Sequence, residues 1–171
     1  MIVEALHEAI IARLGADAAF GAALTARIDE GGIGLKSLPT VLRSNLAFED
    51  IRQIHASRLP CWVIEAGGAI AGPLTGLTED ERGLTLGGGT QAWRCEVLLG
   101  LVWHENDRER AYTQRLRLAT LVPDLFLRNP DLGVDNCAGC LVVETEPDQG
   151  LNHPWQNWRA LLAAELILVR S

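Results

Sequence analysis

Two segments in the second half of the chain carry a hydrophobic residue at every second position, the two-residue period of a β-strand. The first is Trp93 to Trp103, in which every second residue from Trp93 onward is hydrophobic and the opposite face begins with Arg94 and Glu96. The second is Trp158 to Val169, whose Leu-Leu-Ala-Ala-Glu-Leu portion is equally compatible with a helix. Because this segment closes on Ile-Leu-Val, a run rich in β-branched residues, we predict a strand there.

The first third of the chain has helical spacing. Leu6, Ile10 and Leu14 recur on one face of a predicted N-terminal helix. A second short helix is predicted over Asp17 to Ile28, before a Gly-Gly pair that ends it. A weaker helical pattern covers Phe48 to Arg58. The chain is therefore expected to pack helices against the later strands.

An amphipathic helix is predicted between the two long strands, over Glu105 to Leu121. Asn106 or Asp107 can cap its first turn. Pro123 is expected to end it, because proline has no amide hydrogen for the helical ladder. The residues that this helix is expected to turn toward the sheet are Ala111, Tyr112, Leu118, Ala119 and Val122.

Arg115 falls on the same apolar side of that predicted helix. A guanidinium keeps its charge, and burying it without a partner costs several kcal/mol. It can extend past the rim of the sheet into water, or it can pair with a carboxylate. We predict pairing, with Glu96 or Glu165 as the partner, because both acids interrupt predicted strands.

Shorter segments complete the expected sheet. Cys61 to Glu65 and Leu141 to Thr145 are predicted strands, and Pro147 to Gly150 is a predicted turn. Gly67 to Gly89 is rich in glycine and contains an acidic cluster, so we predict a long, partly mobile loop. Loops of this length in compact domains usually have a function, and we expect this one to be ordered by contact with a neighbouring subunit.

Length and composition indicate one globular domain over residues 1–171. Hydrophobic residues make up 48% and charged residues 22%, which excludes a fully disordered chain. No apolar run approaches the roughly 18 residues of a membrane span, and the N-terminus lacks the pattern of a secretory signal. The net charge of -7 argues against general nucleic-acid binding. We expect a protein that is made in the cytoplasm and has no membrane partner.

Two segments resemble ligand-binding motifs but lack essential parts. Gly31 to Ser37 is glycine-rich and contains a Lys-Ser pair, but Leu35 stands where a phosphate-binding loop needs glycine. Cys137 and Cys140 have the CxxC spacing, and His153 follows them. A structural zinc site needs about four ligands, so we predict no metal and no cofactor. The default for both cysteines is a reduced, partly buried thiol in a loop. If the two thiols are partly exposed, replacing both with serine should change the stability by no more than about 1 kcal/mol.

No catalytic residues are predicted, and we expect that the protein is not an enzyme. His104-Glu105 is not followed by the second histidine of a zinc protease, and no serine nucleophile motif is present. The arginines of the central helix alternate with acids, which indicates a solvated, salt-bridged face. Four are involved, Arg108, Arg110, Arg115 and Arg117.

The order of these segments resembles the tail-terminator family of long-tailed bacteriophages. The resemblance covers most of the chain and is carried by three pieces. They are the strand that Pro60 opens, Val97 to Trp103 running into the Arg110 to Leu121 helix, and the closing Arg159 to Val169 strand.

The resemblance implies the fold class α/β (α+β), with a mostly antiparallel sheet of about four strands and helices packed on it. It also implies a homo-oligomer, a hexameric ring that caps the tail tube, ends tube polymerisation and joins the tail to the neck and head-completion protein in the virion. The family has no catalytic residues to transfer. The chain departs from the family in the Gly67 to Gly89 loop and the Cys137 to Cys140 segment.

Two alternatives remain open from the sequence. The first is another phage neck or minor tail component, because such proteins share much of the same segment order. The second is a small metal- or ligand-binding cytosolic domain, which requires Cys137, Cys140 and His153 to converge on one ion. The host and the tail type, contractile or non-contractile, are not encoded in these patterns.

Overall fold

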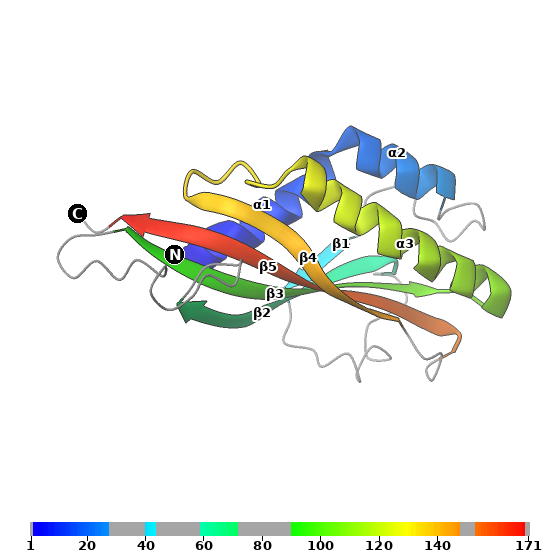
Figure 1. Ribbon diagram of the computed structural model, residues 1–171. Helices are drawn as coiled ribbons and strands as arrows, with labels where there is room; N and C mark the ends of the chain where they lie inside the picture. The colour runs from blue at the N-terminus through cyan, green and yellow to red at the C-terminus, as the bar shows by residue number, and fades with distance from the viewer. Residues whose placement is uncertain (1, 28–39, 44–58, 72–89, 148–152, 170–171) are drawn as a thin grey trace.

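The computed structural model describes residues 2–27, 40–43, 59–71, 90–147 and 153–169. These residues form a five-stranded sheet with three helices on one face (Figure 1). The helices are α1 (Ile2–Ala16), α2 (Ala18–Arg27) and α3 (Arg108–Arg128). The strands, in chain order, are β1 (Thr40–Arg43), β2 (Cys61–Ala71), β3 (Thr90–His104), β4 (Cys137–Pro147) and β5 (Trp155–Val169).

The strand order across the sheet is β1-β2-β3-β5-β4, and all neighbours are antiparallel except β1 and β2. The predicted α+β class is confirmed. The short parallel strand β1 was not predicted, because four residues are too few to show a period. The central pair is the longest, running from Thr90 opposite Val169 to His104 opposite Trp155.

The alternation of β3 and β5 sorts their side chains onto the two faces of the sheet, as predicted. Cys95, Val97, Leu99, Leu101 and Trp103 of β3 are buried beneath the helices. The matching β5 residues are Trp158, Ala160, Leu162, Ala164 and Leu166, all at most 1% exposed. The helical alternative for this last segment is therefore wrong.

Helices α1 and α2 confirm the predicted N-terminal pair. Leu6, Ile10 and Leu14 of α1 are buried in the main core. The side chain of Asp17 accepts a hydrogen bond from the amide of Phe20 at 2.7 Å, so it caps the start of α2. Phe20 is itself buried and its ring lies 6.2 Å from that of Trp62 on β2. The cap thus fixes the point at which α2 turns onto the sheet.

The prediction that α3 ends at Pro123 is wrong, because the helix continues to Arg128. Its N-cap is Asp107, one of the two residues proposed for that role. Proline inside a helix costs about 3 kcal/mol. Leu125 and Phe126 follow it and are fully buried, each contributing about 1.5–3 kcal/mol. The burial of these two side chains offsets the cost of Pro123.

The buried face of α3 is also rotated from the prediction. Ala111, Leu118 and Val122 are buried as expected, but Tyr112 is 58% exposed and Ala119 is only partly buried. Gln114 and Leu121 occupy the buried positions that the prediction missed. Tyr112 lies at the border between the buried and the exposed face of α3. Its hydrophobic character alone therefore does not determine which face it occupies.

Strands β2 and β4 are both longer than predicted. Gly67 to Ala71 belongs to β2, so the predicted glycine-rich loop is wrong over these five residues. A register shift between Ala66 and Ala69 accommodates the two glycines. Cys137 and Cys140 lie inside β4 and not in a loop, a second correction. In both cases pairing with a long neighbouring strand overrides weak local propensity.

Several predictions fall outside the described residues. They are the Gly31 to Pro39 segment with its phosphate-loop-like pattern, the Phe48 to Arg58 helix, residues 72–89 of the predicted loop, and most of the Pro147 to Gly150 turn.

Candidate assembly surface

The two CxxC cysteines face the helix layer together with Cys95 of β3. Cys95 and Cys140 are both paired with Ala164, one on each side of it, so the small alanine separates two thiols across β5. Cys137, Cys140 and Cys95 are 7%, 3% and 3% exposed. The expectation of partly exposed thiols is therefore wrong. All three are free thiols.

Burial raises the pKa of each of these three thiols. For Cys140, burial followed by the neighbouring Cys137 raises the pKa to about 12. A thiol that keeps its proton at neutral pH is a poor nucleophile and a poor metal ligand. The cluster therefore belongs to the core of the molecule.

His153 lies at the other end of the sheet from these cysteines. It precedes the start of β5, and its Nε2 is 3.1 Å from the carbonyl oxygen of Asn106. The cysteines pair with Ala164 and Leu166, nine or more residues further along β5, or roughly 30 Å at about 3.3 Å per residue. The metal-binding alternative required these three residues to meet, and the geometry separates them.

Arg115 has a specific partner, as predicted, but the partner is an amide and not a carboxylate. Its Nη1 donates to Oε1 of Gln156 at 2.6 Å. Glu96, one of the two predicted partners, instead pairs with Arg94 on its own strand at 3.0 Å. Glu96 and Glu165 point to the sheet face opposite the helices, which α3 does not reach. The predicted partners were selected for their negative charge, without regard to the face of the sheet on which they lie. Gln156 was not among them.

Gln156 and its neighbours form a buried polar hub where β3, α3 and β5 meet. Nε2 of Gln156 donates to the carbonyl oxygens of Glu105 and Pro154, both at 3.3 Å. Nε1 of Trp103 donates to Oε1 of Gln114 on α3 at 2.9 Å. Four residues of the hub are at most 6% exposed, so their hydrogen bonds are formed away from water. They are Trp103, Glu105, Gln114 and Gln156. The hub fixes the start of α3 on the sheet.

The acidic member of the hub holds the first turn of α3. Oε1 of Glu105 accepts from the amide of Asp107 at 2.9 Å, and Oε2 lies 3.8 Å from Nη1 of Arg110. Arg110 also lies 3.9 Å from Asp107. The prediction of a salt-bridged arginine face is thus correct for Arg110. These contacts position the first turn of the helix.

The sheet face opposite the helices is partly polar. Glu65 of β2 is paired with Leu98 of β3, and Arg159 of β5 is paired with Gly100, two residues further along β3, so the two charges lie diagonally across that strand. Burial raises the pKa of Glu65, and the charge of Arg159 opposes that rise. Arg159 also lies 3.5 Å from Glu146 of β4. The charges are arranged across strands, which fits a role in holding strand register.

Strand β4 carries exposed hydrophobic side chains at the border of the sheet. Within the described part of the chain it pairs only with β5, so its other backbone edge has no strand beside it. Leu141 is 42% exposed and Val143 is 46% exposed. We call Gly139 to Val143 the β4 edge. Unpaired strand edges with apolar side chains are templates for strand pairing with another chain.

A second exposed apolar surface runs along α3. Its most exposed members, Tyr112, Leu116 and Leu127, are 58%, 54% and 73% exposed. Ala119 and Pro123 lie between them on the same side of the helix, at a spacing of three to four residues. We call these five residues the α3 stripe. The sequence prediction missed it because the helix was expected to end before Leu127 and because Tyr112 and Ala119 were expected to face the sheet.

The described residues contain no cluster of three or more His, Cys, Asp or Glu side chains placed to hold a metal ion. None of the described helices has the length and apolar character of a membrane span. No protein-family model matches the sequence, and no curated protein matches it. Function must therefore be argued from the β4 edge and the α3 stripe.

Proposed function

We propose that this protein is a structural subunit of a bacteriophage tail, a tail-terminator protein that acts without catalysis. In this proposal six copies form a ring that caps the tail tube, ends its polymerisation and joins the tail to the neck. The virion is its site of action, and its partners are further copies of itself, the tube protein and the neck protein. The observation that carries the proposal is the β4 edge.

An assembly subunit needs a surface that is stable alone but complementary to a neighbour. The β4 edge offers backbone donors and acceptors together with Leu141 and Val143. Acidic residues Glu144 and Glu146 follow, and they disfavour pairing beyond this short segment. A neighbour can therefore add at one defined register and not along the whole strand.

A closed ring requires that each subunit present two different surfaces, one to each neighbour. β4 lies at one border of the described sheet and β1 at the other, so the molecule has two distinct ends (Figure 1). The α+β fold with one helical layer agrees with the expectation from the family resemblance. The net charge of -7 is also compatible with a ring through which DNA passes without adhering.

The proposal is tested by the mass of the purified protein and by the shape of its particles. Native mass spectrometry should give a hexamer, and negative-stain electron microscopy should show rings that bind one end of tail tubes. The double substitution Leu141→Lys and Val143→Lys should abolish the ring, because lysine on an edge strand opposes strand addition. Circular dichroism should show that this variant remains folded.

The matched control is Leu116→Lys, which places the same charge on the exposed α3 stripe and should leave the ring intact. A protein that remains monomeric at all concentrations, with or without tail tubes, contradicts the proposal. Rings that bind the head-proximal neck but never a tail tube would favour the neck-component alternative.

A further inference from the structure

We infer that the α3 stripe is a self-complementary contact through which two copies of this chain pair, with their α3 helices antiparallel. This inference concerns a different surface from the β4 edge and does not depend on the ring. The partner is a second copy, because three features of this surface are complementary to themselves about a two-fold axis. They are the apolar side chains, the backbone hydrogen-bonding groups at the midpoint and the charges at the two ends of the helix.

The stripe stands on a free side of α3. At 100° per residue its five positions fall within an arc of about 80°. The neighbouring α2 lies on another side, to which Arg128 turns to contact Asp17 at 3.0 Å. The core-facing side holds Leu118 and Phe126. The helix therefore has one face for the sheet, one flank for α2 and one apolar stripe that no described element covers.

The stripe is symmetric about its own midpoint, between Ala119 and Thr120. Leu116 and Pro123 lie equally far from that point on either side, and so do Tyr112 and Leu127. When two such helices run antiparallel, Tyr112 of each copy meets Leu127 of the other. Ala119 at the centre is small enough for the two helices to approach closely. A two-fold contact needs this kind of self-complementary pattern.

The backbone at the midpoint supplies a second, independent reason. Pro123 has no amide hydrogen, so the carbonyl oxygen of Ala119 lacks its helical hydrogen-bond donor. Across the two-fold axis, Ala119 lies opposite Thr120 of the second copy. The Thr120 hydroxyl can donate to that carbonyl oxygen, once in each direction. The proline that interrupts the ladder thus creates an acceptor where the second copy brings a donor.

The charges at the two ends of α3 are opposite. Around its start, Arg108, Arg110, Arg115 and Arg117 outnumber Glu105, Asp107 and Glu109, so four positive and three negative charges leave +1. Around its end, Asp124, Asp131 and Asp135 outnumber Arg128, so three negative charges and one positive leave -2. Antiparallel pairing places the positive end of each helix beside the negative end of the other. Parallel pairing would oppose like charges.

The surface area available for this contact is smaller than that of a stable interface. The exposed fractions of Tyr112, Leu116 and Leu127 correspond to roughly 400 Å² of apolar surface per copy, within the range of about 300–600 Å² for the largest patch on a typical monomer. Stable interfaces bury about 800 Å² per partner. The pair should therefore be weak and reversible, and it should form only at high protein concentration.

Site-directed crosslinking tests the geometry. Thr120→Cys places two thiols beside the two-fold axis, where a short bis-maleimide should join two copies. Thr113→Cys is the matched control, because it sits on the same helix about 10 Å from the midpoint and its two copies lie about 20 Å apart. The four native cysteines are buried and should give little background. Crosslinked dimer from Thr120→Cys in at least tenfold excess over Thr113→Cys is expected.

Sedimentation equilibrium tests the energetics. Leu116→Lys should weaken self-association at least tenfold, whereas Leu141→Lys should leave this dimer unchanged while affecting the ring. Equal crosslinking at both cysteine positions, or a monomer of the unmodified chain at several hundred micromolar, would overturn the inference. A dimer that forms no rings supports this inference and contradicts the proposed function. Rings that form without the α3 contact support the proposed function and contradict this inference.

Discussion

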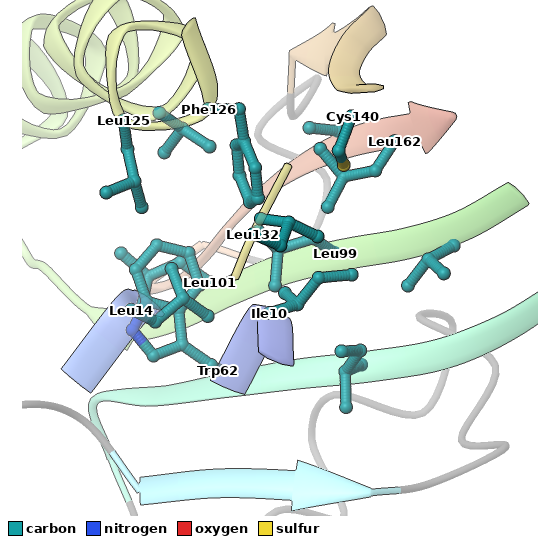
Figure 2. Packing of buried hydrophobic residues seen from close by; sticks show 14 of the residues in the cluster. Ile10, Leu14, Trp62, Leu99, Leu101, Leu125, Phe126, Leu132, Cys140 and Leu162 are labelled. Carbon is teal, nitrogen blue, oxygen red and sulfur yellow. The ribbon is translucent and has the colours of Figure 1, made fainter. Parts of the chain in front are cut away.

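The two ends of β5 are joined to α3 by different chemistry. At the end near Leu162 and Ala164 the contacts are apolar, and Figure 2 shows Phe126 of α3 directed toward the same group of side chains as Cys140 and Leu162. At the other end Gln156 bonds to Arg115. Apolar packing tolerates small displacements, whereas hydrogen bonds require particular partners. The hub therefore determines where α3 starts on the sheet. The apolar end contributes most of the free energy that holds α3 against the sheet.

The apolar end should be the more sensitive to truncation. Phe126→Ala removes a fully buried ring and leaves a cavity in the hydrophobic core, so we expect a loss of about 3–5 kcal/mol in the free energy of unfolding. Urea denaturation measures it. The control is Leu127→Ala, the next residue along the helix and 73% exposed, with an expected effect within about 0.5 kcal/mol. Similar losses for both variants would mean that this end of α3 is not packed as described.

The polar end should respond less, and in a coupled way. Arg115→Met leaves Oε1 of Gln156 without its donor, at an expected cost of about 1–3 kcal/mol. Gln156→Met removes the acceptor and also the bonds that its Nε2 donates to Glu105 and Pro154, so the double variant should lose less stability than the sum of the two single variants. A double-mutant cycle in urea yields the coupling. Strict additivity would show that the 2.6 Å contact contributes nothing to stability.

The smallest expected effect concerns the buried thiols and depends on pH. An unfolded Cys140 loses its proton near its ordinary pKa of 9.0, whereas burial raises the pKa in the folded chain to about 12. Between these values the unfolded state binds fewer protons, so stability should fall as pH rises above 9. One thiol contributes up to about 1.4 kcal/mol per pH unit. Cys140→Ala should reduce this slope between pH 9 and 10.5, and an unchanged slope would contradict the buried location.

The contrast between the two ends also explains how far the sequence could be interpreted. The β3 strand was predictable because alternation over many residues reports a half-buried strand directly, and the β5 strand because its segment closes on a run rich in β-branched residues. Helix α1 was predictable from its helical spacing, with Leu6, Ile10 and Leu14 on one face. These elements depend on local sequence patterns, and they define the fold class.

The remaining features depend on contacts between distant residues. The partner of Arg115 lies 41 residues away. Nothing in the local pattern distinguishes Gln156 from any other polar residue before a strand. The extension of α3 past Pro123 depends on whether Leu125 and Phe126 reach a core that other segments build. The α3 stripe was missed because Pro123 and Leu127 belong to that extension and because Tyr112 and Ala119 were expected to face the sheet.

The position of β5 in the sheet has a consequence for the order of events during synthesis. β5 lies between β3 and β4, yet it follows both in the chain. When β4 leaves the ribosome, its partner in the described sheet has not been made, and one side of β3 is also unpaired. At about 5–20 residues per second, β5 follows within a few seconds. The nascent chain must keep two strands apart for that time, and the sheet is completed when β5 enters between them.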